Sequence, residues 1–104
     1  MAFGAMKPCD SCKELWKVYP IRLPEDLVEA VRRARRFIDA GVIEWLDDEH
    51  SRRNLGLVPF DRVTEEGPFG DIISYDFRCR HCGRKFLLIA ETYHGRGGRW
   101  EPAA

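Results

Sequence analysis

Four cysteines carry the clearest chemistry in this sequence of 104 residues. They form two pairs, Cys9 with Cys12 and Cys79 with Cys82, and both pairs have the same C-x-x-C spacing. A tight turn of this length lets two thiolates point at one ion, and two such turns supply the four ligands of a tetrahedral site. The spacing therefore predicts that Cys9, Cys12, Cys79 and Cys82 bind one zinc ion per chain, although four thiolates accept iron as well.

The second pair continues into Gly83, so that residues 79–83 read Cys-Arg-His-Cys-Gly. Glycine tolerates the positive φ that follows the second ligand, and backbone amides in such a turn can point at the sulfurs. This segment resembles the knuckle of the zinc-ribbon and rubredoxin-like families, in which C-x-x-C-G lies at the tip of a hairpin. The resemblance indicates a kind of site and no activity. Four thiolates leave no open coordination position, which is typical of a structural zinc.

The long separation between the pairs departs from compact four-cysteine motifs, whose pairs usually lie about 15–20 residues apart. One shared metal requires a folded insert that returns Cys79 to Cys12, and loop-closure entropy grows slowly enough with length to permit it. Disulfides, metal sites shared between chains and a dithiol redox site are the alternatives. We favour the shared metal, because neither pair has the βα placement of thioredoxin-like chemistry and the first residues contain no secretory signal.

The insert between the pairs contains one strong helix pattern. Pro24 suits a first helical turn, and Gly41 supplies a stop signal. Apolar residues recur on one face at a period of 3.6, namely Leu27, Val31, Ala34 and Ile38. We expect this face to pack on a sheet. The opposite face carries Arg32, Arg33 and Arg36, which we interpret as a solvated surface in preference to a nucleic-acid-binding helix.

The last third of the chain predicts most of the sheet. Residues 73–80 alternate between apolar and polar side chains, as in a strand with one buried face. Residues 85–93 return as a strand that is apolar on both faces, as expected at the centre of a sheet. Less regular segments predict shorter strands at 15–19, 42–46, 57–60 and 99–101, a polar loop at 47–54, and turns at 65–68 and 95–98. Together they predict an α+β fold, a small antiparallel sheet with one covering helix, pinned by the four-cysteine site.

Composition limits the classes of protein to which the chain can belong. It contains 17 basic and 17 acidic residues with 44% hydrophobic residues, which opposes wholesale disorder and gives bulk charge no attraction to nucleic acid. The length indicates one domain over residues 1–104, with 1–6 as a flexible tail. The longest apolar run, 86–90, is far shorter than the roughly 20 residues that span a bilayer. We therefore expect no membrane association and a cytoplasmic location.

A local excess of basic residues indicates where a partner would bind. Six lysines and arginines stand against one acid, Glu91, between Arg78 and Arg99. The candidate partner-binding residues in and beside this segment are Arg80, Arg84, Lys85, His94, Arg96, Arg99 and Trp100. Residues 91–100 are also similar to the tail of small bacterial immunity proteins, which neutralise toxins by binding, and this resemblance implies a protein partner.

Two other functions compete with protein binding. The basic residues together with Phe86, Tyr93 and Trp100 would suit a nucleic-acid-binding zinc ribbon, since exposed aromatic rings stack on single-stranded bases. An enzyme is the less favoured class, because Glu91, Tyr93 and His94 have no recognisable second carboxylate or nucleophile beside them. We predict a non-enzymatic binding protein and leave its oligomeric state open.

Overall fold

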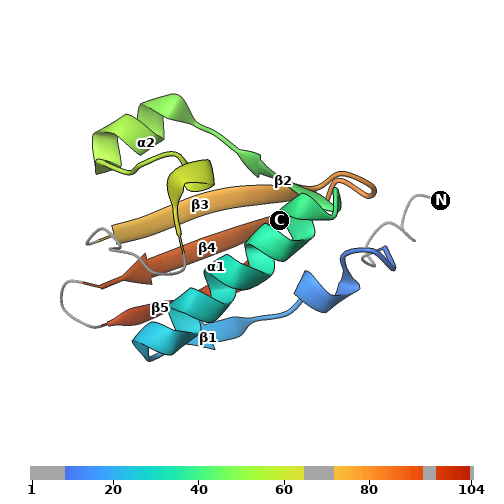
Figure 1. The fold of residues 1–104 in the computed structure, drawn as a ribbon, viewed down its shortest axis with the longest axis horizontal. Coiled ribbons are helices and arrows are strands. Elements are labelled where there is room, and N and C mark those ends of the chain that lie inside the picture. Colours follow the sequence, from blue (N-terminus) through green and yellow to red (C-terminus); the bar gives the residue numbers. More distant parts are fainter. Residues whose placement is uncertain (1–8, 65–71, 93–95, 104) are drawn as a thin grey trace.

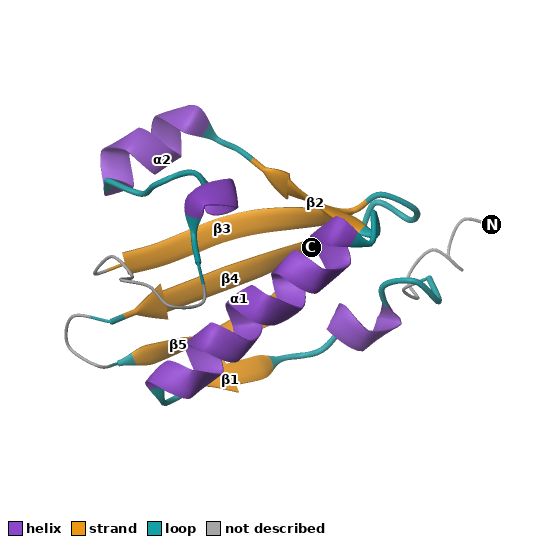
Figure 2. Ribbon diagram, viewed as in Figure 1, coloured by secondary structure: helices purple, strands orange, loops and turns teal. Residues whose placement is uncertain are grey.

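The computed structural model describes residues 9–64, 72–92 and 96–103. The predicted tail at 1–6, the predicted turn at 65–68, Tyr93 and His94 lie outside these ranges. Within them, a five-stranded antiparallel sheet is crossed by one long helix, which confirms the α+β fold (Figures 1 and 2). No helix of the described segments is long and apolar enough to cross a membrane.

The described elements range in length from three residues to the sixteen of the main helix. Their order is η2 (Lys13–Leu15, a 3-10 helix), β1 (Tyr19–Ile21), α1 (Pro24–Asp39), β2 (Ile43–Leu46), α2 (Glu49–Leu55), η3 (Phe60–Arg62, a 3-10 helix), β3 (Ile72–Cys79), β4 (Lys85–Glu91) and β5 (Gly97–Ala103). The strands lie in the order β1-β5-β4-β3-β2, and every neighbouring pair is antiparallel. The apolar strand β4 is therefore central, as the sequence predicts.

Helix α1 follows the predicted pattern closely. Its buried residues are Leu27, Ala30, Val31 and Ala34, and Phe37 and Ile38 pack partly buried against the same core. The helix ends before Gly41, whose φ of 77° is the left-handed conformation that glycine adopts without strain. Of the three arginines predicted on the solvated face, Arg33 is only partly exposed and lies over the ring of Tyr19, 3.8 Å from its centroid. Arg35, at the flank of that face, donates hydrogen bonds to the carbonyls of Phe60 and Val63.

The core lies between α1 and one face of the sheet. Alternate residues of β3 and β4 point into it, from Ile73 to Cys79 and from Phe86 to Ala90. Trp100 of β5 joins them, buried and stacked near Phe86. The intervening residues of the same strands form the other face of the sheet, which is partly or fully exposed along its length.

Four short segments differ from the sequence-based prediction. Residues 49–55 form α2 where a polar loop is expected, and residues 60–62 form η3 where a strand is expected at 57–60. The segment 15–19 is not a strand, because η2 ends at Leu15 and β1 begins only at Tyr19. Two of the glycines predicted in a flexible turn instead begin β5, where a Cβ on Gly98 would overlap the carbonyl oxygen of Ile89. The close approach of two strands therefore requires glycine at position 98.

Candidate metal centre

The two cysteine pairs meet at one end of the sheet. Figure 1 shows the beginning of the described chain beside the loop that joins β3 to β4. The sulfur atoms of Cys9, Cys12, Cys79 and Cys82 all lie within 4.8 Å of one another. The folded insert thus returns the chain to its starting point, as a site shared by both pairs requires.

The spacing of the sulfur atoms matches a tetrahedral thiolate site. The Sγ–Sγ distance is 3.6 Å for Cys9 with Cys12, for Cys9 with Cys79 and for Cys12 with Cys82. Four sulfurs placed tetrahedrally at metal–sulfur distances of about 2.3 Å would lie about 3.8 Å apart. A disulfide brings two sulfurs to about 2.05 Å, and all four cysteines are free thiols. The arrangement is compatible with a metal ion and excludes a disulfide within this conformation.

The second pair lies at a hairpin tip, as its resemblance to a ribbon knuckle implies. Strand β3 ends at Cys79, and the amide of Gly83 donates a hydrogen bond to the Cys79 carbonyl at 3.0 Å. The amide of His81 donates to Sγ of Cys79 at 3.4 Å. Gly83 has φ +80° and open space around it, so the backbone conformation and not a close contact favours glycine there. These bonds fix the turn and direct a backbone dipole at a ligand sulfur.

The first pair lies in a turn that is anchored to the sheet by the residues that follow it. The amide of Cys12 donates to the Cys9 carbonyl at 3.2 Å, and η2 begins directly afterwards. The indole Nε1 of Trp100 then donates to the carbonyl of Leu15 at 3.0 Å. Both Leu15 and Trp100 are buried. The sheet therefore positions the first knuckle through one buried hydrogen bond and the packing of η2.

Trp16 adds a second attachment between the two knuckles. Its ring meets Phe86 edge to face, with centroids 5.7 Å apart, and the guanidinium of Arg84 lies 5.2 Å from its centroid. Arg84 belongs to the loop that carries Cys82, so the cation and the ring join the two halves of the site. Of the residues that position the site, the sequence-based prediction missed Leu15 and Trp16, and no spacing pattern in the sequence marks them.

The four thiols differ in exposure and in acidity. Cys12 and Cys79 are buried, Cys9 is partly buried and Cys82 is exposed. Burial raises the pKa of Cys12, and the neighbouring thiols raise it further. Burial likewise raises the pKa of Cys79, although backbone amides act in the opposite direction. Burial also disfavours the Cys82 thiolate, but backbone hydrogen bonds involving Arg84 and Cys9 and the nearby thiols outweigh it and lower that pKa to about 6.

The predicted partner-binding residues do not form one surface. Arg80, Arg84 and Lys85 lie beside the metal centre, and Arg80 and Lys85 are exposed. Arg96 is exposed at the opposite end of β4, where its backbone amide donates to Glu91 at 3.3 Å. The seven-residue length of β4 separates the two groups, which corresponds to roughly 20 Å. The basic excess that is continuous in sequence is therefore divided in space.

Trp100 is wrong as a contact residue, because only 1% of its surface is exposed. The alternation of Arg99, Trp100 and Glu101 is the signal that could have shown it pointing inward. The aromatic platform proposed for nucleic acid fails for the same reason, since Phe86 is also fully buried. Arg99 is exposed and pairs with Glu101 at 2.7 Å.

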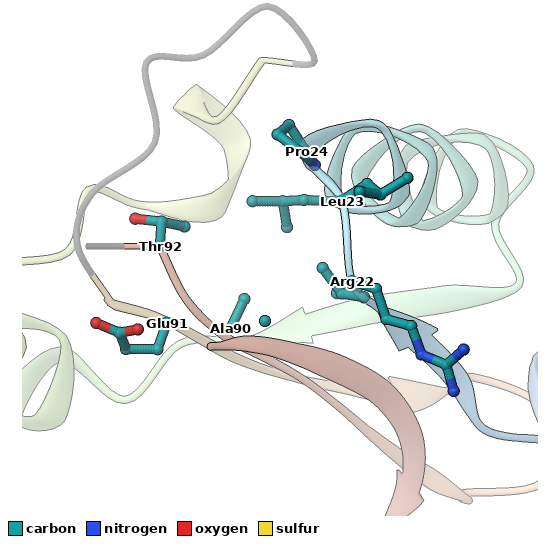
Figure 3. Close-up of a pocket in the computed structure, with 9 residues that line it drawn as sticks. Arg22, Leu23, Pro24, Ala90, Glu91 and Thr92 are labelled. Carbon is teal, nitrogen blue, oxygen red and sulfur yellow. The ribbon is translucent and has the colours of Figure 1, made fainter. Parts of the chain in front are cut away.

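A pocket of about 240 Å³ lies between the start of α1 and the ends of β4 and β5. Leu23, Leu27 and Ala90 contribute apolar surface to it. Its two charged lining residues are Arg22 and Glu91. In Figure 3 the guanidinium of Arg22 and the carboxylate of Glu91 point in opposite directions, so these two charged groups do not converge on the pocket. Comparison of the chain with family models, with curated proteins and with solved structures found no match.

Proposed function

We propose that the four cysteines hold one zinc ion as a structural centre, in a non-enzymatic protein that acts by binding another protein. The observation that carries the metal assignment is the approach of four sulfurs to within 4.8 Å, from two segments that lie far apart in the sequence. A metal would supply the attraction that keeps neighbouring thiolates together. Four sulfur ligands also complete a tetrahedron, which leaves no position at which a substrate or a water molecule could react.

A structural role suits the place of the centre in the fold. From Cys9 onward, where the structure describes it, the segment before α1 pairs with the sheet only through β1, a strand of three residues. Short strands at an edge contribute little independent stability. A metal that joins Cys9 and Cys12 to the β3–β4 loop would hold this segment in place, and metal binding would then be coupled to folding.

The protein-binding part of the proposal rests on the surface of the second knuckle. Arg80, His81 and Gly83 are exposed together beside the centre, and Lys85 extends the basic surface into β4. A rigid, positively charged loop suits an acidic patch on a partner protein. The similarity of residues 91–100 to immunity proteins supports a partner that is neutralised by binding, although Gly98 and Trp100 in that segment have structural roles of their own.

Metal content and stability test the zinc centre. We expect native mass spectrometry of the purified chain to find one zinc per chain, bound until a strong chelator is added. Cys12→Ser should lose the metal and several kcal/mol of stability, because structural zinc contributes its binding free energy to folding, about 10–16 kcal/mol in small zinc peptides. Ser11→Ala, the adjacent change in the same exposed turn, should retain both.

Three outcomes would contradict the zinc centre. Iron in place of zinc would show visible charge-transfer bands and would change the identity of the metal. A metal-free chain that melts at the same temperature with and without chelator would remove the centre altogether. Cys9–Cys12 or Cys12–Cys82 disulfides in the freshly purified chain would favour the dithiol redox alternative.

Retention of partners on immobilised metal-loaded protein tests the binding role. We expect Arg80→Glu to lose a specific protein that the wild-type chain retains, because the substitution reverses the charge of the exposed knuckle. Arg53→Glu is the matched control, since Arg53 is exposed on α2 and pairs locally with Glu49 at 2.6 Å. Retention of the same protein by both variants would contradict the knuckle surface, and salt-sensitive retention of nucleic acid would favour the ribbon alternative.

A further inference from the structure

Strand β4 is apolar on both faces, but the described helices bury only one of them. Phe86, Leu88 and Ala90 point into the core and are buried. Leu87 and Ile89 point to the other face and remain partly exposed. An antiparallel sheet with one solvated face normally alternates apolar with polar residues. The second apolar row of the central strand therefore lies on the face that the described helices leave uncovered.

Charges surround this apolar row in a regular pattern. Along β4 the outer face reads Lys85, Leu87, Ile89, Glu91, which is a cation, two apolar residues and an anion. Glu101 lies beside Leu87 on β5, and Arg99 lies beside Ile89. On the β3 side, the neighbours of Leu87 and Ile89 are Asp76 and Ser74.

This pattern is complementary to itself under a twofold rotation. The twofold axis lies parallel to the sheet, runs perpendicular to the strands and passes between Leu87 and Ile89. The rotation exchanges the positions of Lys85 and Glu91, and those of Arg99 and Glu101. Each cation of one copy would then face an anion of the other, and Leu87 would face Ile89. The same operation sets Asp76 against the neutral Ser74, so none of these positions brings like charges together. Isologous interfaces require such self-complementarity.

We infer that the open face of the sheet binds a second copy of this chain, with the central strands of the two sheets packed face to face and running in opposite directions. Face-to-face sheets pack with their strands within about 30° of each other and about 10 Å apart, which allows the side chains of both faces to interdigitate. The in-chain pair of Arg99 and Glu101 would meet its symmetry mate and form a cluster of four alternating charges. The inference goes beyond the metal centre and does not depend on it.

The area of the open face determines how much of it must be buried in a stable dimer. The three inner strands have seven or eight residues and the edge strands β1 and β2 only three and four, so the face measures at most roughly 24 Å by 24 Å. A stable interface of standard size covers about 800 Å² of each partner. The flat face is smaller than this, so the whole of it is required together with the protruding side chains of the charged rim, and substitutions at the rim should weaken association measurably.

Association of the metal-loaded full chain across a dilution series, followed by light scattering and sedimentation, tests the inference. We expect a dimer at micromolar concentration. Leu87→Glu should produce a monomer, because it buries a carboxylate against Ile89 of the other copy. Val58→Glu is the matched control, since Val58 is 52% exposed and its carbonyl accepts a hydrogen bond from Tyr75, which points to the helix-covered side of the sheet; it should leave the dimer intact.

A charge reversal gives a second test. Lys85 is exposed, whereas Glu91 is partly exposed and accepts the Arg96 amide, so thermal melts of each variant separate loss of the dimer from loss of the fold. Lys85→Glu should raise the dimer dissociation constant about tenfold, since it sets two pairs of like charges against each other. Lys85→Glu combined with Glu91→Lys should restore it. A monomeric wild-type chain throughout the series, a dimer that survives Leu87→Glu, or a double reversal that restores nothing would each overturn the inference.

Discussion

Trp100 connects the metal centre to the sheet through a single side chain. Its ring is buried near Phe77 and Phe86, and its indole donates to the backbone of the first knuckle at Leu15. If the Leu15 carbonyl lost this donor, it would stay buried without a hydrogen bond, and the free-energy cost of removing it from water would no longer be offset. The position of two metal ligands, Cys9 and Cys12, thus depends on a residue that lies at the other end of the sequence.

Trp100→Phe should therefore weaken both the fold and the metal centre. The change keeps an aromatic ring but removes the donor to Leu15 and part of the buried volume, and we expect a loss of about 2–4 kcal/mol in the free energy of unfolding. We also expect faster loss of metal to a chelator, since the first knuckle is released. Thermal melts and the rate of zinc transfer to a colorimetric chelator measure the two effects.

Trp45→Phe provides the comparison for Trp100→Phe. Trp45 lies on the edge strand β2, is only partly buried and contacts Tyr75 edge to face at 6.2 Å. The substitution should lower stability less and leave the rate of metal transfer unchanged. Equal transfer rates for wild type, Trp45→Phe and Trp100→Phe would show that Trp100 does not position the knuckle.

At the scale of elements, α1 begins with a cap that reaches back from its first turn. Oδ2 of Asp26 accepts hydrogen bonds from the backbone amides of Arg22 and Leu23, at 2.9 and 3.0 Å. These two bonds hold the pKa of Asp26 below its usual value of 3.8. The carboxylate also lies at the end of the helix where the dipole favours negative charge.

Asp26→Asn should lower the melting temperature at neutral pH, with a difference from wild type that shrinks in acid. The sign follows from the lowered pKa in the folded state. The carboxylate stabilises the fold above its unfolded pKa, and the stabilisation is lost as pH falls through the folded pKa. Thermal melts of Asp26→Asn and wild type at a series of pH values measure the difference in melting temperature. Effects of acid on the thiols act on both proteins alike and cancel in this difference.

Asp39→Asn is the control at the other end of the same helix, where the dipole disfavours a carboxylate. It should not lower the melting temperature at neutral pH. A stability difference between Asp26→Asn and wild type that stays constant from neutral to acid pH would contradict the capping role.

The sequence predicts the long elements well because their patterns repeat. The apolar stripe from Leu27 to Ile38 spans several helical turns, and β3 alternates through all of its residues. The four cysteines are predicted as one cluster because each pair carries its own turn geometry. Patterns that repeat within one element depend little on the rest of the fold.

The short elements are predicted poorly because distant residues decide them. Helix α2 has seven residues, fewer than an isolated helix needs, and its start is held by Arg52, which pairs with Asp47 at 3.0 Å. The turn η3 is fixed by Arg35 of α1, which donates to the carbonyls of Phe60 and Val63. Such contacts cannot be read from local spacing. The partial exposure of Leu87 is missed for a similar reason. An apolar run indicates that a strand is central in the sheet, but it does not indicate which face of the sheet a helix covers.

At the scale of the whole molecule, the segment before α1 is attached differently from the rest. Strands β3, β4 and β5 pair along most of their length, whereas β1 pairs through three residues, from Tyr19 to Ile21. The described residues of this segment are also attached by the cysteine cluster, the packing of Leu15 and Trp16 and the bond from Trp100. Contacts of Glu14 and Tyr19 with Arg36 and Arg33 of α1 add to these. Regions with fewer attachments open at lower free energy than the core.

Removal of the metal should therefore open this segment before the rest of the fold. We expect amide hydrogen exchange after chelation to accelerate in η2 and β1. Helix α1 and the β3–β4 pair should keep most of their protection, because they share one buried core. Cys12→Ser should show the same pattern with or without chelator. Equal acceleration in α1 and β4 would mean that the centre holds the entire fold together. Unchanged exchange in β1 would mean that the centre does not hold the first segment.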